Sequence, residues 1–418
     1  MKRIKIVGGN KLSGTINISG AKNSAVALIP AAILSDEEVV IENVPNISDI
    51  DALEEILLYL NADVKRENGK VRINSSGIVN KEIPETIAKK LRASYYFMSS
   101  LLGKYKYVEM YFPGGCSIGA RPIDQTLKGY RALGAKVVEE NDKFTISADE
   151  LNGTTVYLDM PSVGATVNIM LTAVRAKGET IIENAAKEPE IVNVAMLLNS
   201  MGAKITGAGT SSIHIEGVNY LSKGYCEVIP DRIEAGTYII AGALVGDKLK
   251  INNIIPEHVN SLLDKLFEMG CYLEITDNSV IISQAKNGLP VNVKTMGYPG
   301  FPTDLQQPLT TLLTQLNGKS SLEETIYENR FQNVKYLVDM GASIVIDNKK
   351  IYVTGPSNLV GKEVTATDLR AGACLVLAGL KADGETIIDN VEHVLRGYEN
   401  IIGKLSDVGA KIELEEYN

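Results

Sequence analysis

The stretch LEEILLYLNADVKRENGKVRI at residues 53–73 contains the pattern that decides the fold. Its first half places apolar residues at the spacing i, i+3, i+4, i+7 of one helix face, namely Leu53, Ile56, Leu57 and Leu60. Asn61-Ala62 then ends the helix. Residues 63–73 alternate apolar and polar side chains around Asn68-Gly69, a strong signal for a tight hairpin. The stretch therefore predicts one helix followed by two antiparallel strands.

The pair that ends this helix recurs along the 418 residues, as a Gly or Asn followed by Ala or Cys. The six pairs are Asn61-Ala62, Gly134-Ala135, Gly202-Ala203, Gly270-Cys271, Gly341-Ala342 and Gly409-Ala410. They are 73, 68, 68, 71 and 68 residues apart, which indicates an α/β fold built from six repeats of about 70 residues. Glycine is expected at these points because it ends helices at positive φ without strain.

The chain ends suggest how the repeats are grouped. The sixth repeat stops after one strand, Lys411–Leu414, while the strand Arg3–Val7 has no partner nearby in sequence, so we expect the termini to complete one repeat together. One domain is then discontinuous, with residues 1–21 plus 230–418, three repeats and both termini. The other is inserted at 22–229, with three repeats and the loop around Cys116. The cleft between two domains is the expected ligand site.

Composition narrows the class of protein. Hydrophobic residues at 45% and charged residues at 22% are typical of a globular protein, and the apolar stretches 25–34 and 371–380 are too short to span a bilayer. A net charge of -9 argues against nucleic-acid or anionic-membrane partners. The N-terminus is interpreted as a strand of a cytoplasmic protein.

The sequence predicts neither a metal centre nor a disulfide framework. Its four cysteines are dispersed without a CxxC pair. Cys226, Cys271 and Cys374 lie in apolar contexts and are expected to be buried. Motifs for binding nucleoside triphosphates or dinucleotides are absent, and the three histidines are scattered, so a histidine-based hydrolase is disfavoured.

Cationic residues in loop-like contexts with small neighbours are the first functional signal. They are Lys22, Arg92, Arg121, Arg330, Arg370 and Arg396. Guanidinium groups bind carboxylates and phosphates in a bidentate manner, so several together suit a small anion. The alternative for each residue alone is a surface ion pair or a contact with a helix end.

Two further side chains are candidates for a direct part in catalysis. Cys116 lies in the glycine-dense run 111–122, where an exposed thiol five residues from Arg121 is a candidate reactive group. Asp304, in Phe301-Pro302-Thr303-Asp304, is either a functional carboxylate or a helix cap.

These segments together resemble the UDP-N-acetylglucosamine 1-carboxyvinyltransferases over essentially the whole chain. The matching runs are Lys22-Asn23, Pro113–Cys116 through Arg121-Pro122, Ser162–Thr166, Phe301–Asp304, Glu328–Phe331, Asp368–Arg370 and Arg396–Tyr398. The resemblance implies a two-domain inside-out α/β barrel. It also implies transfer of the enolpyruvyl group of phosphoenolpyruvate to the 3'-hydroxyl of UDP-N-acetylglucosamine in peptidoglycan synthesis, with no cofactor or metal.

The resemblance also implies roles for single residues. Cys116 matches the general acid and the site of alkylation by fosfomycin, Asp304 matches the base, and Lys22 and Arg396 are the other catalytic positions. The phosphoenolpyruvate set is Lys22, Asn23, Arg121, Arg370 and Arg396. The nucleotide-sugar set is Asn23, Arg92, Arg121, Pro122, Ile123, Asp124, Gln125, Ser162, Val163, Gly164, Asp304 and Ile326.

Two positions depart from the family pattern, because Met160 and Thr126 stand where many members have Lys and His. Both positions belong to the nucleotide-sugar site. The departures therefore bear on the affinity of this site for UDP-N-acetylglucosamine. Two alternatives remain. One is 5-enolpyruvylshikimate-3-phosphate synthase, which the Cys116 loop disfavours. The other is a catalytically silent paralogue that binds the nucleotide sugar and regulates another protein, which retention of Cys116 and Asp304 disfavours.

Overall fold

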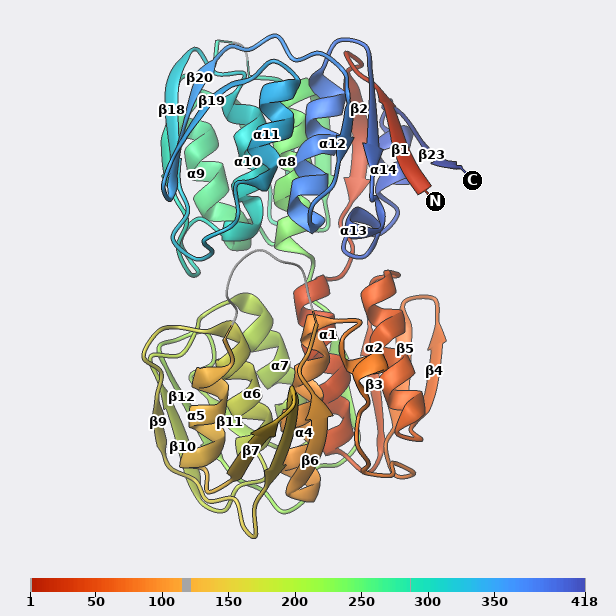
Figure 1. Ribbon diagram of the computed structural model, residues 1–418, viewed down its shortest axis with the longest axis vertical. Coiled ribbons are helices and arrows are strands. Elements are labelled where there is room, and N and C mark those ends of the chain that lie inside the picture. The colour runs from red at the N-terminus through yellow and green to blue at the C-terminus, as the bar shows by residue number, and fades with distance from the viewer. Residues whose placement is uncertain (1, 115–121, 286, 418) are drawn as a thin grey trace. The chain divides into compact units, whose positions relative to one another are not determined.

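The structure is a computed structural model that describes residues 2–114, 122–285 and 287–417. The described residues of 1–19 and 230–418 form one compact unit (unit 1), and those of 20–229 form a second (unit 2). Each unit has its own apolar core. Figure 1 shows that helices fill the middle of each unit while strands lie around them.

Unit 2 alternates buried helices with short strands. Its elements are α1 Lys22–Ala31, η1 Ala32–Leu34, β3 Glu38–Glu42, α2 Ser48–Tyr59, β4 Asp63–Glu67, β5 Lys70–Asn74, α3 Glu85–Ala88, η2 Arg92–Tyr95, α4 Tyr96–Tyr105, β6 Tyr107–Tyr111, α5 Asp124–Ala132, β7 Lys136–Glu140, β8 Lys143–Ser147, β9 Thr155–Tyr157, α6 Val163–Ala173, β10 Glu179–Glu183, α7 Pro189–Ser200, β11 Lys204–Thr206, β12 Ser212–Glu216 and β13 Gly224–Glu227.

Unit 1 repeats this alternation with both chain ends included. Its elements are β1 Lys2–Val7, β2 Leu12–Asn17, α8 Arg232–Val245, β14 Gly246–Asn252, η3 Pro256–Val259, α9 Asn260–Glu268, β15 Leu273–Ile275, β16 Ser279–Ile282, β17 Asn292–Lys294, η4 Thr303–Leu305, α10 Gln306–Leu313, β18 Gly318–Glu323, α11 Gln332–Asp339, β19 Ser343–Asp347, β20 Lys350–Gly355, β21 Glu363–Thr365, α12 Leu369–Lys381, β22 Glu385–Asp389, α13 Glu392–Leu395, α14 Ile401–Asp407 and β23 Lys411–Glu416.

The described strands form six small sheets with one common pattern, three in each unit. In the sheet β13-β3-β5-β4, the hairpin β4–β5 pairs antiparallel with β3, and β13 pairs parallel with β3 on the other side. Asn68 and Gly69 link the hairpin with φ of 50° and 75°, as the sequence predicts for a primed turn. In the sheet β6-β8-β7 the parallel partner is reduced to a single bridge between Ile83 and Met110.

The two chain ends share the sheet β21-β22-β1-β23. β1 pairs antiparallel with β22 and with β23, and Ile4 lies opposite both Ile388 and Leu414. β23 thus takes the place of β4 in the common pattern, and β1 takes the place of β5. The expectation that the termini complete one repeat is confirmed.

Three helices in each unit are buried nearly all round. In unit 1, α8, α10 and α12 pack against one another, and in unit 2, α4 packs against α1 and α6. The apolar stretches 25–34 and 371–380 are buried throughout and belong to this inner layer. No helix in the described part of the chain is long and apolar enough to cross a membrane.

The helix-ending residues of the repeats have the backbone that the sequence predicts. Gly134, Gly202, Gly270, Gly341 and Gly409 have φ between 81° and 109°, and Asn61 has φ of 69°. A Cβ atom at Gly270 would meet open space, whereas one at Gly341 would lie 2.8 Å from the carbonyl oxygen of Asn358.

Replacement of Gly270 by Ala is expected to lower the stability of unit 1 by about 1 kcal/mol, because an alanine at positive φ is strained. Gly341→Ala is expected to cost more, because a backbone clash adds to that strain. Gly270→Asn serves as the control and is expected to cost less, since Asn tolerates this conformation. Urea unfolding curves measure all three, and an unchanged midpoint for Gly270→Ala would contradict the expectation.

Candidate functional site

Asp304 lies in η4, directly before the inner helix α10. Its side chain caps neither helix, because the capping positions are Pro302 for η4 and Leu305 for α10. Instead its carboxylate accepts hydrogen bonds from two guanidinium groups, one on each oxygen. Arg330 Nη2 is 2.7 Å from Oδ1, and Arg370 Nη2 is 3.0 Å from Oδ2.

In the cluster of Asp304, Arg330 and Arg370, the two arginines are more deeply buried than the carboxylate. The side chains of Arg330 and Arg370 are 3% and 4% exposed, whereas that of Asp304 is 25% exposed. Burial alone would raise the pKa of the Asp304 carboxyl, but the charges of Arg370 and Arg330 outweigh burial and hold that pKa well below its usual range. Asp304 is therefore ionised at neutral pH, and its carboxylate is the part of the cluster most open to solvent.

Arg370 is held by its own helix start. Asp368 caps α12 by accepting hydrogen bonds from the backbone N–H groups of Arg370 and Ala371, at 2.8 and 3.0 Å. The Arg370 guanidinium also lies 5.3 Å from the ring centre of Tyr398, whose buried hydroxyl bonds to Thr237 at 2.8 Å. Arg396, the other predicted anion-binding residue of unit 1, is half-buried in the turn after α13.

Arg330 belongs to the cluster, although the sequence indicates it only as a cationic loop residue and as part of a family motif. Its second guanidinium nitrogen, Nη1, donates to Thr303 Oγ1 at 2.8 Å. Thr303 in turn donates to Glu324 at 2.8 Å. No sequence signal points to Glu324, because its hydroxyl partners Thr295 and Thr303 lie 29 and 21 residues away and become its neighbours only in the folded chain.

Lys22 is the first residue of the inner helix α1 in unit 2. Its Nζ is 2.7 Å from Oδ2 of Asp49 in α2, and the two side chains are 14% and 5% exposed. The alternative of a surface ion pair is wrong for Lys22, because the carboxylate that it meets is buried. Asn23, the next residue, is exposed at the same helix start.

Arg92 and Gly164 both lie against the side chain of Tyr95. The Arg92 guanidinium lies 5.7 Å from the ring centre of Tyr95 and 5.1 Å from that of Phe112. A Cβ atom at Gly164 would lie 1.8 Å from the Tyr95 hydroxyl oxygen, so only glycine allows this approach. The structure therefore brings the predicted nucleotide-sugar residues Arg92 and Gly164 together.

Gly164 and Val163 belong to the first turn of α6, and Ser162 caps that helix. The Ser162 hydroxyl accepts a hydrogen bond from the N–H of Ala165 at 3.2 Å. The first N–H groups of a helix have no partner within the helix, and together with the helix dipole they favour an anion. This part of the predicted set is a helix start of a known anion-binding type.

The predicted residues at the start of α5 are linked by hydrogen bonds to the segment before Ser162. Pro122 is exposed and Ile123 is buried just before α5, and Asp124 and Gln125 are its first residues. The Gln125 amide donates to Asp159 Oδ2 and accepts from the Asp159 N–H, each at 2.9 Å. Gln125 thereby ties α5 to the segment that leads into Ser162.

The two departures from the family pattern lie in different environments. Met160 follows Asp159 and is 64% exposed, whereas Thr126 is 2% exposed within α5. A side chain at position 160 can therefore reach a ligand from the surface, but Thr126 is covered by the protein. Ile326, predicted to contact the nucleotide sugar from unit 1, is 43% exposed.

Cys116 and Arg121 lie outside the described residues, so their predicted roles are not examined by the structure. The other cysteines are buried, as the sequence predicts. Burial raises the pKa of each of the thiols of Cys226, Cys271 and Cys374 to about 11. Thiols with such pKa values are poor nucleophiles at neutral pH.

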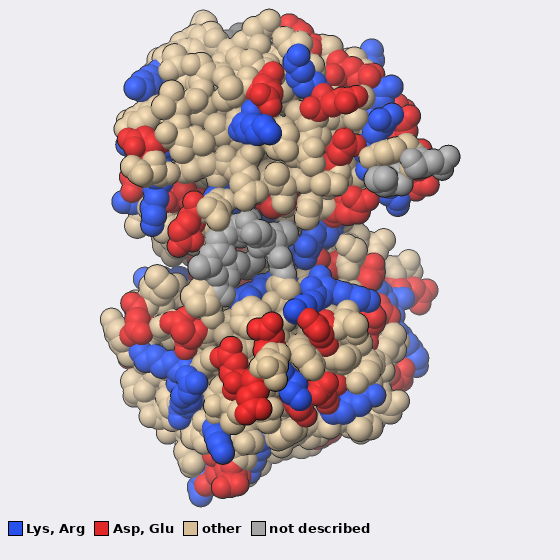
Figure 2. Space-filling model, viewed as in Figure 1, with Lys and Arg blue, Asp and Glu red and all other residues tan. Residues whose placement is uncertain are grey.

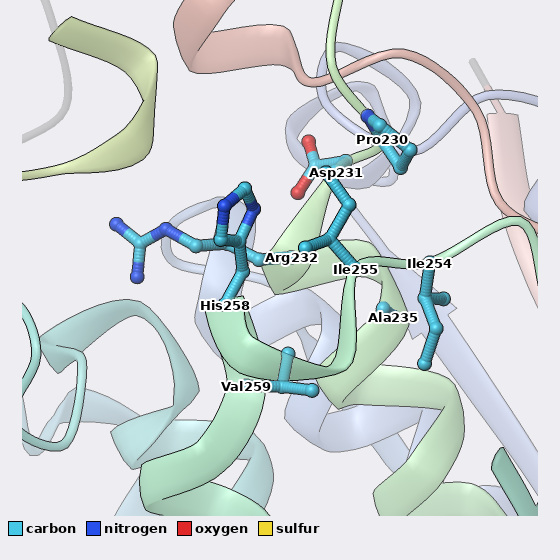
Figure 3. A pocket seen from close by; sticks show the side chains of 8 residues that line it. All are labelled: Pro230, Asp231, Arg232, Ala235, Ile254, Ile255, His258 and Val259. Atoms are coloured by element: carbon cyan, nitrogen blue, oxygen red, sulfur yellow. The ribbon is translucent and has the colours of Figure 1, made fainter. Parts of the chain in front are cut away.

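A small pocket lies at the start of the inner helix α8 in unit 1 (Figure 3). Its lining comprises Pro230, Asp231, Arg232, Ala235, Ile254, Ile255, His258 and Val259. Asp231 caps α8 through the N–H groups of Ile233 and Glu234. The His258 ring packs edge-on against Tyr298, and the Arg232 guanidinium lies 5.6 Å from the same ring.

Acidic and basic side chains are interspersed on the face of each unit that Figure 2 shows. Within the described ranges, no group of three or more His, Cys, Asp or Glu side chains is arranged to hold a metal ion.

The sequence was then compared with known families. The model of the EPSP synthase (3-phosphoshikimate 1-carboxyvinyltransferase) family matches residues 6–405. UDP-N-acetylglucosamine 1-carboxyvinyltransferase 2 of Listeria monocytogenes serovar 1/2a is 52% identical over 98% of this chain and 97% of that protein. The protein of the same name from Bacillus subtilis strain 168 is 52% identical over 99% of this chain and 96% of its own.

The chain belongs to the UDP-N-acetylglucosamine 1-carboxyvinyltransferase family. Solved structures agree with an enolpyruvyl transferase fold. The enolpyruvyl transferase NikO from Streptomyces tendae superposes with a TM-score of 0.89 at 25% identity, covering 100% of this chain and 99% of that one. EPSP synthase from Acinetobacter baumannii superposes with a TM-score of 0.76 at 16% identity, covering 100% of both chains, and shows the shared fold. The predicted inside-out α/β architecture is confirmed.

Replacement of Asp304 by Asn is expected to lower stability by about 3 kcal/mol at pH 7, because it leaves two buried guanidinium groups without their anion. The folded-state pKa of Asp304 is depressed, so its contribution to stability is fully present above its unfolded pKa of about 4 and is lost as the pH falls through the folded value. The difference between wild type and variant should therefore be equal at pH 7 and pH 5.5.

Thermal and urea unfolding at these two pH values measure the difference. Asp159→Asn is the matched control, because the Asp159 carboxylate is 63% exposed where it pairs with Lys128, and its loss should cost less than about 1 kcal/mol. Equal costs for the two substitutions would show that the Asp304 cluster is not a buried ion pair.

Proposed function

We propose that this chain transfers the enolpyruvyl group of phosphoenolpyruvate to the 3'-hydroxyl of UDP-N-acetylglucosamine and releases inorganic phosphate. This reaction is the first committed step of peptidoglycan synthesis. The observation that carries the proposal is the 52% identity over 98% of the chain to a relative named for this reaction. The cluster of Asp304 with Arg330 and Arg370 supports the proposal, because it contains a carboxylate that can act as a base and cations that can bind an anionic substrate.

UDP-N-acetylglucosamine is proposed to bind through both backbone and side-chain groups. The α6 start at Ser162, Val163 and Gly164 offers N–H groups to the diphosphate, and Arg92 beside it offers a planar cation. Asn23, Arg121, Pro122, Ile123, Asp124, Gln125, Asp304 and Ile326 complete the proposed set. The exposed Ile326 side chain gives an apolar surface for part of this ligand.

Phosphoenolpyruvate is proposed to bind to cations, because its phosphate and carboxylate place several negative charges on a small molecule. The set is Lys22, Asn23, Arg121, Arg370 and Arg396. Lys22 is already held in one position by Asp49, so little side-chain entropy is lost when it binds an anion. Cations held in place also stabilise the charge that develops on the departing phosphate.

Asp304 is proposed to accept the proton of the sugar hydroxyl. In the ligand-free arrangement two guanidinium groups make it a weak base, because its pKa is held far below neutral. An anion that draws the charge of Arg370 toward itself raises the basicity of Asp304. The arrival of phosphoenolpyruvate would thus activate the base at the moment when the hydroxyl must attack.

The proposed reaction has two stages. The sugar oxygen adds to C2 of phosphoenolpyruvate while the thiol of Cys116 protonates C3, which gives a tetrahedral ketal. Loss of a proton from C3 and departure of phosphate then yield the enolpyruvyl product. No cofactor is needed, because phosphoenolpyruvate contains its own leaving group. A cytoplasmic location is part of the proposal, since free thiols persist in a reducing compartment.

The function is tested by following phosphate release from phosphoenolpyruvate with UDP-N-acetylglucosamine, or with shikimate 3-phosphate, as the acceptor. We expect release with the nucleotide sugar alone, and loss of that release after preincubation with fosfomycin. Cys116→Ala should abolish turnover. Release that requires shikimate 3-phosphate would favour the EPSP synthase reaction, and release with neither acceptor would favour a silent paralogue.

The role of Lys22 is tested by Lys22→Met, which keeps the length of the side chain and removes its charge. We expect KM for phosphoenolpyruvate to rise on the order of 10- to 100-fold, while the affinity for UDP-N-acetylglucosamine changes less than twofold. Steady-state kinetics and calorimetric titration measure the two quantities.

The variant also leaves Asp49 buried without a cation, so stability must be separated from binding. The double variant Lys22→Met with Asp49→Asn should recover stability without recovering the KM for phosphoenolpyruvate. Lys204→Met removes an exposed cation that pairs with Glu216 and serves as the matched control. Normal phosphoenolpyruvate kinetics in Lys22→Met would remove Lys22 from the site.

A further inference from the structure

Glu324 is a buried carboxylate to which the proposed mechanism assigns no role. It follows the last residue of β18 and is 1% exposed. Its Oε1 accepts from the Thr295 hydroxyl at 2.9 Å and from the N–H groups of Ile326 and Tyr327 at 2.8 and 3.3 Å. Its Oε2 accepts from the Thr303 hydroxyl at 2.8 Å. All four of these donors are neutral.

The two oxygens of Glu324 therefore hold two different segments. Oε1 fixes the turn that carries Ile326, and Oε2 fixes the η4 turn that carries Asp304. Because both turns bond to the same planar carboxylate, their separation is set within a few ångströms by one rigid group. A buried carboxylate with several hydrogen-bond donors is a suitable anchor, since each of its oxygens accepts from protein donors.

The directions of the hydrogen bonds show how Glu324 is connected to Asp304. A threonine hydroxyl has one proton, and Thr303 gives it to Glu324, so the Thr303 oxygen must accept the hydrogen bond from Arg330 Nη1. Arg330 then donates through Nη2 to Asp304. The chain Glu324–Thr303–Arg330–Asp304 runs from one carboxylate through a hydroxyl and a cation to a second carboxylate. With Arg370 on the other oxygen of Asp304, two anions are balanced by two cations, which permits the burial of the network.

We propose that Glu324 is a positioning residue of the transfer reaction, which sets the distance between the nucleotide-sugar contact at Ile326 and the base at Asp304. This inference rests on the proposed function and goes beyond it, because it assigns the alignment of acceptor and base to a residue that touches neither substrate.

The two oxygens of Glu324 can be tested separately with glutamine. Its amide nitrogen cannot face the N–H groups of Ile326 and Tyr327, because two donors would meet. The amide oxygen must therefore keep the Ile326 side, and the amide nitrogen replaces the oxygen that accepts from Thr303. In Glu324→Gln the amide nitrogen donates to the Thr303 oxygen, so the Thr303 proton loses its anionic acceptor and the connection to the base is altered, while the turn that carries Ile326 is retained; Glu324→Ala loses both connections.

This difference predicts distinct kinetic signatures. For Glu324→Gln we expect kcat to fall on the order of 10- to 100-fold, because a misplacement of the base by a fraction of an ångström to 1 Å is enough for such a loss. Its KM for UDP-N-acetylglucosamine should stay within twofold of wild type. Glu324→Ala should lose kcat and also raise this KM about 10-fold or more.

Thr303→Val should lower kcat at least as much as Glu324→Gln, since it removes the hydroxyl that bonds both to Glu324 and to Arg330. The double variant Glu324→Gln with Thr303→Val should be no slower than Thr303→Val alone, because Glu324 acts on Arg330 through that hydroxyl. Glu323→Gln, which removes the surface partner of Lys294 one residue earlier, is the matched control and should be kinetically normal.

The readouts separate this inference from the proposed function and from misfolding. Wild-type phosphate release with the nucleotide sugar must be seen first, and its absence would overturn both proposals. With wild type active, a normal kcat for Glu324→Gln, or additive losses in the double variant, would overturn the positioning role alone. A misfolded fraction would lower kcat in proportion to a loss of calorimetric binding sites, and such a match in Glu324→Gln would also overturn it.

Discussion

The structure depends on one constraint, which is that each unit encloses helices that are buried nearly all round. A helix in that position satisfies its backbone internally and packs its side chains against the rest of the unit on every face. Only its ends can offer polar groups to a ligand. The candidate residues follow this constraint closely, because they lie at the starts of the inner helices: Lys22 at α1, Arg92 before α4, Ser162 at α6, Asp304 before α10 and Arg370 at α12.

Helix starts favour anions through their unpaired N–H groups and their dipoles. In this chain the cationic residues Lys22 and Arg370 stand at such starts, where their charge adds to that of the helix end instead of cancelling it. Each is compensated by a carboxylate, the buried Asp49 for Lys22 and the partly exposed Asp304 for Arg370. Each cation is paired with a carboxylate of the protein in this arrangement. A ligand with more negative charge can compete with that carboxylate for the cation.

The sequence predicted the repeat well, because its signals are local. Helical spacing and an Asn-Gly turn within residues 53–73 define one unit, and a glycine at positive φ ends nearly every copy. The site was predicted less completely. Asp304 could be read as a cap or as a functional group, and only the folded chain shows Arg330 and Arg370 on its two oxygens. Glu324 gave no signal at all, since its hydroxyl partners Thr295 and Thr303 are distant in the sequence.

The sheet that contains both termini has a consequence for synthesis of the protein. β1 is made before unit 2, whereas its neighbours β22 and β23 are made after it. Unit 2 is continuous in sequence, so it can fold while translation is still under way. The sheet of unit 1 that contains β1 can form only after β22 and β23 have been made, so during synthesis a completed unit 2 coexists with an unfinished unit 1.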